Sequence, residues 1–165
     1  MNLLIIEDDE CCRRVLVETA YYLAEEAGIE LAVDTAGTLA EALPLVERAD
    51  GILCDGQFPA KPGEMPQANW LIVAGAASRP AIPFALLSGS GVMVALARGH
   101  GHAAFEKPDQ VRVAFQYLFG RIESLRDRVI ERLQTENPVV AEVDAANREI
   151  YDEEKKEHGK RKRGR

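Results

Sequence analysis

The sequence lacks the features that mark membrane, secreted and zinc-binding proteins. No apolar run approaches the roughly 20 residues needed to cross a bilayer, and the opening MNLLIIEDDE is acidic where a signal peptide would be basic. The three cysteines, Cys11, Cys12 and Cys54, fit neither a zinc site nor a disulfide framework, so we expect reduced thiols. These absences favour a cytoplasmic protein with no membrane segment.

Positive charge is scarce over most of the chain. Residues 155–165 hold seven of the 20 Lys and Arg residues and one of the 27 Asp and Glu residues, so residues 1–154 carry 13 positive and 26 negative side chains, a net of −13. So acidic a body does not attract nucleic acid over its surface, and no recognisable DNA-binding domain fits in the C-terminal residues. The basic tail, residues 155–165, is expected to be disordered.

Short apolar runs alternate with helical spacing along the first part of the chain. The runs that end in polar residues are LLIIEDD near residue 3, GILCD at 51–55, FALLS at 84–88 and AAFEK at 103–107, with IELAV at 29–33 as a weaker fifth. Helices are expected up to Gly28, around 39–46, at about 67–77 and at about 91–98, with an irregular Pro- and Gly-rich loop at 56–66. This alternation predicts a parallel sheet with helices on both faces.

Polar side chains gather at the ends of the predicted strands, where α/β sheets place their working sites. In chain order they are Glu7, Asp8 and Asp9, then Asp55, then Ser88, then Lys107. A single acidic strand end is usually a solvated loop start, but several carboxylates together repel one another unless a cation lies among them. Mg²⁺ suits a few carboxylates, a backbone carbonyl and a phosphate oxygen, and lysine and serine side chains can bind the phosphate.

These motifs resemble the receiver domains of two-component response regulators, over residues 1 to about 120. LLIIEDDE looks like the acidic first strand, ILCDGQFP like the phosphoacceptor strand, ALLSGS like the Ser/Thr strand and FEKP like the Lys-Pro strand. The resemblance implies a flavodoxin-like, five-stranded parallel sheet of order 2-1-3-4-5. It also implies that Asp55 accepts a phosphoryl group, and that a magnesium site is formed by Glu7, Asp8, Asp55 and the backbone carbonyl of Gln57. Asp8 would bind the metal directly and Glu7 largely through water.

The resemblance also gives roles to the later motifs. Ser88 and Lys107 would bind the phosphoryl oxygens, and the Lys107–Pro108 peptide bond would be cis. One position departs from the family pattern. Where the family usually has Tyr or Phe three residues before the lysine, this chain has Ala104, with Phe105 one place later.

The function implied is that of a response-regulator receiver protein in a phosphorelay. A histidine kinase or a histidine phosphotransfer protein would donate the phosphoryl group, and the chain would not be an enzyme beyond self-catalysed phosphoryl uptake and autodephosphorylation. Two alternatives remain. A receiver-like docking module that is not phosphorylated is favoured by Ala104, and a hydrolase with an aspartyl nucleophile is disfavoured because Gln57 stands where a second carboxylate would be needed.

A long helical pattern follows Pro108. Its apolar positions are spaced mostly 4, 3, 4, 3, as in a heptad seam: Val111, Phe115, Leu118, Ile122, Leu125, Val129 and Leu133. Residues up to about Leu118 are expected to cover the sheet. Residues 121–154 form a predicted helical extension whose stripe, beginning at Ile122, needs a partner, and a homodimer through this C-terminal helix is one solution. Gly120 weakens the expectation of one continuous helix.

Overall fold

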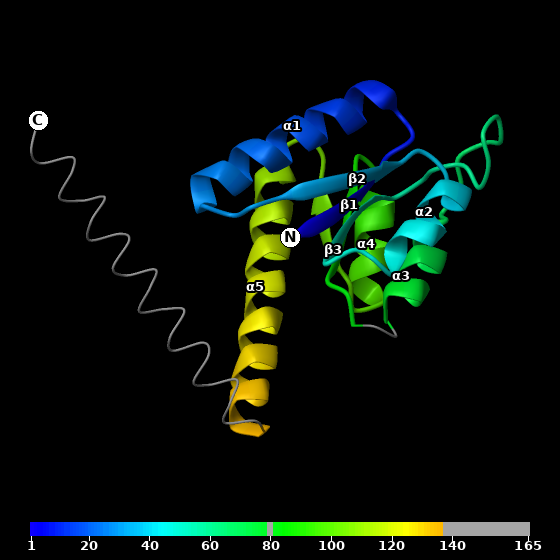
Figure 1. Ribbon diagram of the computed structural model, residues 1–165. Helices are drawn as coiled ribbons and strands as arrows, with labels where there is room; N and C mark the ends of the chain where they lie inside the picture. Colours follow the sequence, from blue (N-terminus) through cyan, green and yellow to red (C-terminus); the bar gives the residue numbers. More distant parts are fainter. Residues whose placement is uncertain (79–80, 137–165) are drawn as a thin grey trace, which may run out of the picture. The chain divides into compact units, whose positions relative to one another are not determined.

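The chain folds around a five-stranded parallel sheet of strand order β2-β1-β3-β4-β5 (Figure 1). A computed structural model describes residues 1–78 and 81–136. The elements are β1 (Asn2–Ile6), α1 (Glu10–Ala27), β2 (Ala32–Ala36), α2 (Leu39–Val46), β3 (Gly51–Asp55), α3 (Trp70–Ser78), β4 (Phe84–Ser88), α4 (Gly91–Gly99), β5 (Ala103–Glu106) and α5 (Val111–Glu136). The predicted fold class and strand order are confirmed.

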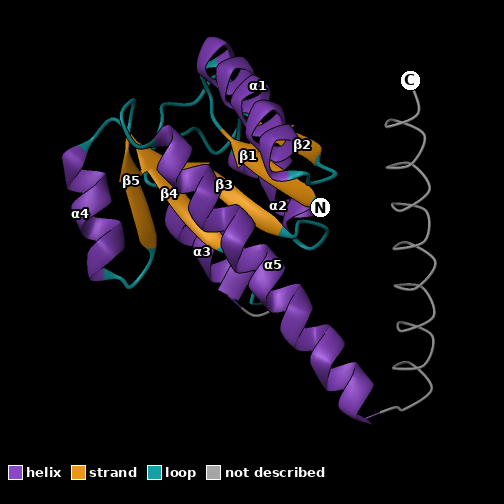
Figure 2. Ribbon diagram, turned by 90° about the vertical axis from the view of Figure 1, so that its left-hand side faces the viewer, coloured by secondary structure: helices purple, strands orange, loops and turns teal. Residues whose placement is uncertain are grey.

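Helices cover both faces of the sheet because the central strands are apolar on both sides. In β1, Leu3 and Ile5 pack with α1 and α5, whereas Leu4 and Ile6 pack with α2, α3 and α4. The strands β3 and β4 divide their side chains between the two cores in the same alternating way. Figure 2 shows α1 and α5 on the near face of the sheet. This packing fixes the strands, and so the positions of their carboxyl ends.

Helix α1 begins and ends where its capping residues dictate. The Asp9 side chain accepts a hydrogen bond from the Cys12 amide at 2.7 Å, as an N-cap does. Gly28 closes the helix in the left-handed conformation, with φ of 70°, which glycine adopts without steric cost. The predicted end at Gly28 is confirmed.

The second strand lies three residues later than predicted, at Ala32–Ala36 rather than 29–33. The Ile29 amide donates to the Ala24 carbonyl at 2.8 Å, so Ile29 belongs to the closing turn of α1. The strand β2 lies at the edge of the sheet and is half-exposed, and it therefore tolerates Asp34 and Thr35. The apolar run indicated the wrong residues because an edge strand does not need to be apolar throughout.

Helix α3 also starts later than predicted, at Trp70 rather than near residue 67. Gln67 is held in an isolated bridge, in which its amide and carbonyl pair with those of Phe58 at 3.1 and 3.0 Å. The expected irregular stretch after β3 therefore continues to Asn69. This segment of residues 56–69, hereafter the β3–α3 loop, is long but has ordered internal contacts.

Helix α5 covers the sheet further along the chain than the sequence indicated. Phe115 and Leu118 are fully buried, as expected, but Ile122 is also buried, at 2% exposure. A Cβ atom at Gly51 would lie 2.7 Å from the Ile122 Cδ1 atom, so the missing side chain of Gly51 makes room for it. Ile122 therefore needs no partner molecule, contrary to the prediction, and Gly120 lies within the helix rather than ending it.

The compact unit that contains the sheet spans Met1–Ile122, and a second unit spans Glu123–Arg165. Within the second unit only residues 123–136 are described, as the last part of α5. The rest of the predicted extension and the basic tail lie outside the described residues. No helix in the described part of the chain is both long and apolar enough to span a membrane.

The role of Ile122 can be measured by chemical unfolding. Ile122→Ala should lower the free energy of unfolding by about 3 kcal/mol, because truncating a buried isoleucine removes apolar contacts and leaves a cavity. Val113→Ala is the matched control on the same helix, where the side chain is 49% exposed, and it should cost less than about 1 kcal/mol. Equal losses in urea unfolding would contradict the assignment of Ile122 to the sheet-covering part of α5.

Candidate functional site

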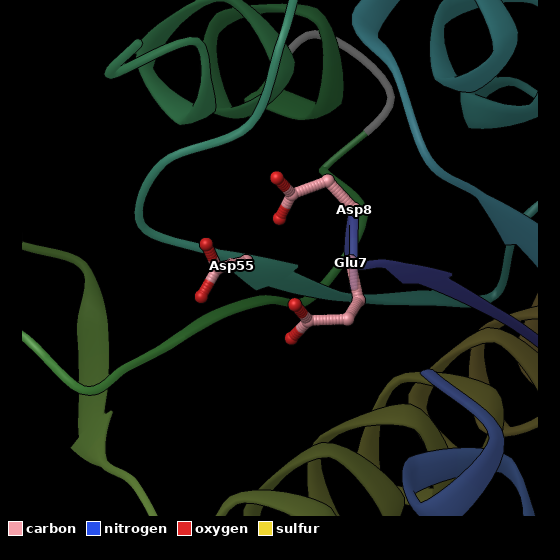
Figure 3. A group of neighbouring side chains, drawn as sticks. All are labelled: Glu7, Asp8 and Asp55. Carbon is pink, nitrogen blue, oxygen red and sulfur yellow. The ribbon is translucent and has the colours of Figure 1, made fainter. Parts of the chain in front are cut away.

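Three carboxylates meet at the carboxyl ends of the two central strands β1 and β3. Glu7 and Asp8 follow β1 directly, and Asp55 is the last residue of β3. Because Ile6 pairs with Cys54, parallel register brings the residues that follow side by side. One carboxylate oxygen from each of the three residues lies within 4.8 Å of the others. In Figure 3 the three side chains extend to the same side of the strands.

Lys107 reaches this carboxylate group from β5, two strands away from β3. Its Nζ atom lies 2.7 Å from Asp55 Oδ1 and also forms an ion pair with Glu7 Oε2. The Lys107 backbone is fixed because its amide donates to the Ser88 carbonyl at 3.0 Å, just past the paired ends of β4 and β5. The Lys107–Pro108 bond is cis, as the resemblance implied. Residues about a hundred positions apart in the sequence are thereby joined.

Burial and the neighbouring charges shift the pKa values of Glu7 and Lys107 in this cluster. Glu7 is only 3% exposed, and burial raises the pKa of its carboxyl group; Lys107 opposes this shift and Asp55 adds to it. Burial alone would lower the pKa of Lys107, but the carboxylates of Asp55 and Glu7 outweigh it and raise that pKa. With these groups ionised, three carboxylates and one ammonium leave two negative charges, which is the charge one divalent cation neutralises.

The third acid of the opening motif has a different task. Asp9 caps α1, and the hydrogen bonds from Cys12 lower the pKa of its carboxyl group. Its amide donates to Glu7 Oε1 at 3.3 Å, which orients the Glu7 side chain. Arg13, one turn into the helix, donates from its guanidinium to the Glu7 carbonyl. The sequence reasoning missed Arg13, although its place four residues after an N-cap was a usable signal.

The second oxygen of Asp55 is bound by the chain that follows it. The Gln57 amide donates to Asp55 Oδ2 at 2.9 Å. Gln57 therefore lies at the cluster, while the metal-binding role of its carbonyl stays a prediction.

Ser88 lies beside this turn and is 4% exposed, and its Oγ atom accepts from the Ser90 amide at 3.2 Å. A Cβ atom at Gly56 would lie 2.5 Å from that Oγ atom, so only glycine leaves the hydroxyl in this position. The importance of Gly56 was not foreseen from the sequence.

The residues present fit a magnesium ion by their chemistry. All the side-chain ligands offered are carboxylate oxygens, the hard donors that Mg²⁺ prefers. No sulfur or imidazole ligand belongs to this three-carboxylate group. The resemblance implies that Asp8, Asp55 and the Gln57 carbonyl hold the ion and that Glu7 acts largely through water, and this ligand set stays a prediction.

The departure at Ala104 has a structural counterpart. Ala104 is buried on the side of the sheet that packs against α4, and both Nε and Nη2 of Arg98 donate to its carbonyl, at 3.1 and 2.8 Å. The aromatic residue one place later faces the opposite side, where the Phe105 ring lies 5.8 Å from the Tyr117 ring of α5. The α4–β5 contact therefore has no aromatic side chain from residue 104.

An apolar groove of about 350 Å³ lies next to the cluster, where the beginnings of α1 and α5 meet. Its lining residues are Cys11, Cys12, Val15, Leu16, Lys107, Pro108 and Val111. Both cysteines are exposed. The groove shares Lys107 with the carboxylate cluster, so a molecule seated in it would lie close to Asp55.

No known protein-family model matches this sequence, and no curated protein sequence matches it. Solved structures do match its fold. A putative response regulator from Chloroflexus aurantiacus is 20% identical, with 73% of this chain and 95% of that chain covered and a TM-score of 0.51. A response-regulator receiver domain from Francisella is also 20% identical, with 73% and 97% covered and a TM-score of 0.50. The chain has the receiver-domain fold.

Likeness at this level concerns the fold alone. A structure titled as an adenylate cyclase, from Rhodopirellula baltica, matches equally well, with 18% identity, 81% of this chain and 96% of that chain covered and a TM-score of 0.53. The receiver-fold match therefore supports the architecture. A functional conclusion must rest on the carboxylate cluster and Lys107.

The close approach at Gly56 provides a test of the site's packing. Gly56→Ala should lower the free energy of unfolding by about 1–3 kcal/mol, because the added methyl group overpacks against the buried Ser88 side chain. Gly89→Ala is the matched control, since a Cβ atom there meets no atom within 4 Å, and its effect should stay within about 0.5 kcal/mol. Equal effects of the two substitutions in denaturant unfolding would contradict this description.

Proposed function

We propose that the chain is a response-regulator receiver protein that accepts a phosphoryl group on Asp55 in a phosphorelay. The observation that carries this proposal is the placement of the Lys107 ammonium 2.7 Å from Asp55 Oδ1, with Glu7 and Asp8 beside it. A carboxylate paired with a fixed cation, next to further hard oxygen ligands, suits phosphoryl transfer, which asks a protein mainly for positioning and charge neutralisation.

In the proposed reaction an oxygen of Asp55 attacks the phosphorus atom of a phosphohistidine on the partner protein. The phosphorus–nitrogen bond breaks as the new oxygen–phosphorus bond forms, and the histidine nitrogen keeps the electron pair. The product is an acyl phosphate on Asp55. Lys107 neutralises the equatorial oxygens during transfer, and its shared pairing with Glu7 keeps the ammonium at the required position.

Magnesium, when bound by Asp8, Asp55 and the Gln57 carbonyl, supplies further neutralisation of the negative charge of the phosphoryl group. The remaining work belongs to the protein. The Ser88 hydroxyl lies at the end of the adjacent strand and can turn toward a phosphoryl oxygen, as the resemblance implies. Its movement would change the face formed by α4, β5 and α5. Gln57 and Ser90 would flank the water molecule that later hydrolyses the acyl phosphate.

The partner proposed is a histidine kinase or a histidine phosphotransfer protein, met in the cytoplasm. The apolar groove beside Lys107 supports this choice, because a partner helix could seat an apolar side chain there while its phosphohistidine faces Asp55. The chain would thus be a phosphoacceptor rather than a turnover enzyme. The homodimer through the C-terminal helix stays a prediction.

A receiver-like docking module is the alternative that one observation favours. Residue 104 is Ala, so the aromatic part of the usual switch is missing. A module used only for docking, however, has no physical reason to bury Glu7 beside a lysine. Phosphoryl uptake distinguishes the two functions directly.

Asp55→Asn should abolish labelling by acetyl phosphate in Mg²⁺ and leave the fold intact, because an amide oxygen is too weak a nucleophile to take the phosphoryl group. Intact-protein mass spectrometry reads the gain of one phosphoryl mass. Asp34→Asn is the matched control, since Asp34 lies on β2 and pairs with Arg48 away from the cluster, and this variant should label normally. A labelled Asp55→Asn protein would refute the acceptor assignment.

Metal dependence gives an independent test. Removing Mg²⁺ with a chelator should eliminate fluoroberyllate binding, and Asp8→Asn should weaken Mg²⁺ binding by at least about tenfold, because a charged oxygen ligand is lost from a site that needs its charge. Isothermal titration measures the metal affinity, and ¹⁹F NMR detects the bound fluoroberyllate. Asp109→Asn, an exposed acid outside the cluster, is the control. Unchanged metal affinity in Asp8→Asn would remove Asp8 from the proposed ligand set.

A further inference from the structure

The β3–α3 loop starts at the proposed phosphoacceptor. Its second residue, Gln57, donates its amide to Asp55 Oδ2 at 2.9 Å. A carboxylate is a strong acceptor because it is charged. Conversion of Asp55 to an acyl phosphate replaces this carboxylate with a carbonyl oxygen and a bridging oxygen, which are both weaker acceptors. The bond that holds Gln57 is therefore sensitive to the chemical state of Asp55.

Contacts within the loop connect its first residues to its last. Phe58 is fully buried, and its amide and carbonyl pair with those of Gln67 at 3.0 and 3.1 Å. The Asn69 side chain, itself 7% exposed, donates to the same Phe58 carbonyl at 2.7 Å. These contacts join the beginning of the loop to its end. A displacement of Gln57 is consequently passed to the residues that follow Phe58 rather than absorbed within a flexible chain.

Pro59 and Ala60, which follow Phe58 in the loop, bind the start of α2. The Leu39 amide donates to the Pro59 carbonyl and the Ala40 amide to the Ala60 carbonyl, each at 3.0 Å. The first amides of a helix have no partner within the helix, so the loop supplies what the helix lacks. Figure 1 shows the segment leading from β3 to α3 beside α2. Contacts of Gln57, Pro59 and Ala60 thus connect Asp55 with α2.

We propose that this connection is a regulatory route, by which phosphorylation of Asp55 releases the first two amides of α2, those of Leu39 and Ala40, from the loop. The inference rests on the proposed function, and it adds an output that runs toward α2 rather than toward α4 and β5. In the phosphorylated state the Gln57 amide loses its carboxylate acceptor while the Gln57 carbonyl serves as the proposed metal ligand. This exchange of contacts shifts the loop, and the Pro59 and Ala60 carbonyls move away from the amides they hold. The amides of Leu39 and Ala40 then open to solvent more often.

The opposite side of the site explains why a second route would matter. Residue 104 has only a methyl group, so no aromatic ring can change its position there. Arg98 holds the Ala104 carbonyl with two hydrogen bonds, at 3.1 and 2.8 Å, which ties α4 to β5. The α4–β5 contact therefore lacks the aromatic side chain that the family pattern places at residue 104, whereas the β3–α3 loop is attached directly to Asp55.

Amide hydrogen exchange measured by NMR tests this route on the intact chain. Fluoroberyllate with Mg²⁺ serves as the mimic of the phosphoryl group, and its binding is monitored by ¹⁹F NMR. We expect the Leu39 and Ala40 amides to exchange about tenfold faster in the bound state. The Glu41 amide is the internal control, because it bonds to the Thr38 side chain at 3.2 Å and not to the loop, and its rate should change less than twofold.

A substitution in the loop completes the test. Asn69→Ala removes the side-chain contact among those that join the two ends of the loop. The Leu39 and Ala40 amides should then exchange rapidly with or without fluoroberyllate, and the ratio of the two rates should fall below two. Arg98→Lys, on the other route, should keep the tenfold response. If Asn69→Ala does not fold, the unmodified protein still decides the question.

The outcomes separate the two proposals. Bound fluoroberyllate with unchanged exchange at Leu39 and Ala40 would overturn the route to α2 and leave the phosphoacceptor assignment standing. Fluoroberyllate that does not bind in the presence of Mg²⁺ would overturn the proposed function and this inference with it.

Discussion

The site depends on one ammonium group that serves two carboxylates. Glu7 is almost fully buried, and a buried carboxylate without a counter-ion is strongly destabilising. Lys107 supplies that counter-ion and contacts Asp55 with the same Nζ atom. The strand order explains why residue 107 is a lysine. The strand β5 lies two strand spacings from β3, about 10 Å. Only a long side chain can cover this distance.

Much of the fold was predictable because the central strands are buried on both faces. Such strands must be apolar throughout, and runs such as GILCD and FALLS have few other interpretations. The errors occurred where local hydrogen bonding decides the outcome. Ile29 is part of a helix-closing turn rather than a strand, and Gln67 is part of a loop bridge rather than a helix. The hydrogen bonds of Ile29 and Gln67 cannot be predicted from the pattern of apolar residues.

The candidate site was predictable to the extent that strand order determines it. Parallel strands place their ends on one edge, so the meeting of Glu7, Asp55 and Lys107 followed from chain order and the resemblance. What could not be predicted are contacts that depend on exact backbone approach. Gly56 matters because the Ser88 hydroxyl occupies the space of its missing side chain, and Arg13 matters because its guanidinium donates from the first turn of α1 to the Glu7 carbonyl.

The cysteines have a practical consequence for work on this protein. Cys54 is buried within β3, and burial raises the pKa of its thiol well above the usual value. Cys11 and Cys12 are exposed on the wall of the groove beside Lys107. A maleimide fluorophore would therefore attach to Cys11 or Cys12, in the groove that Lys107 also lines, rather than to the buried Cys54. The fluorescence of such a label would report the binding of a partner protein in the groove, and no cysteine would have to be introduced.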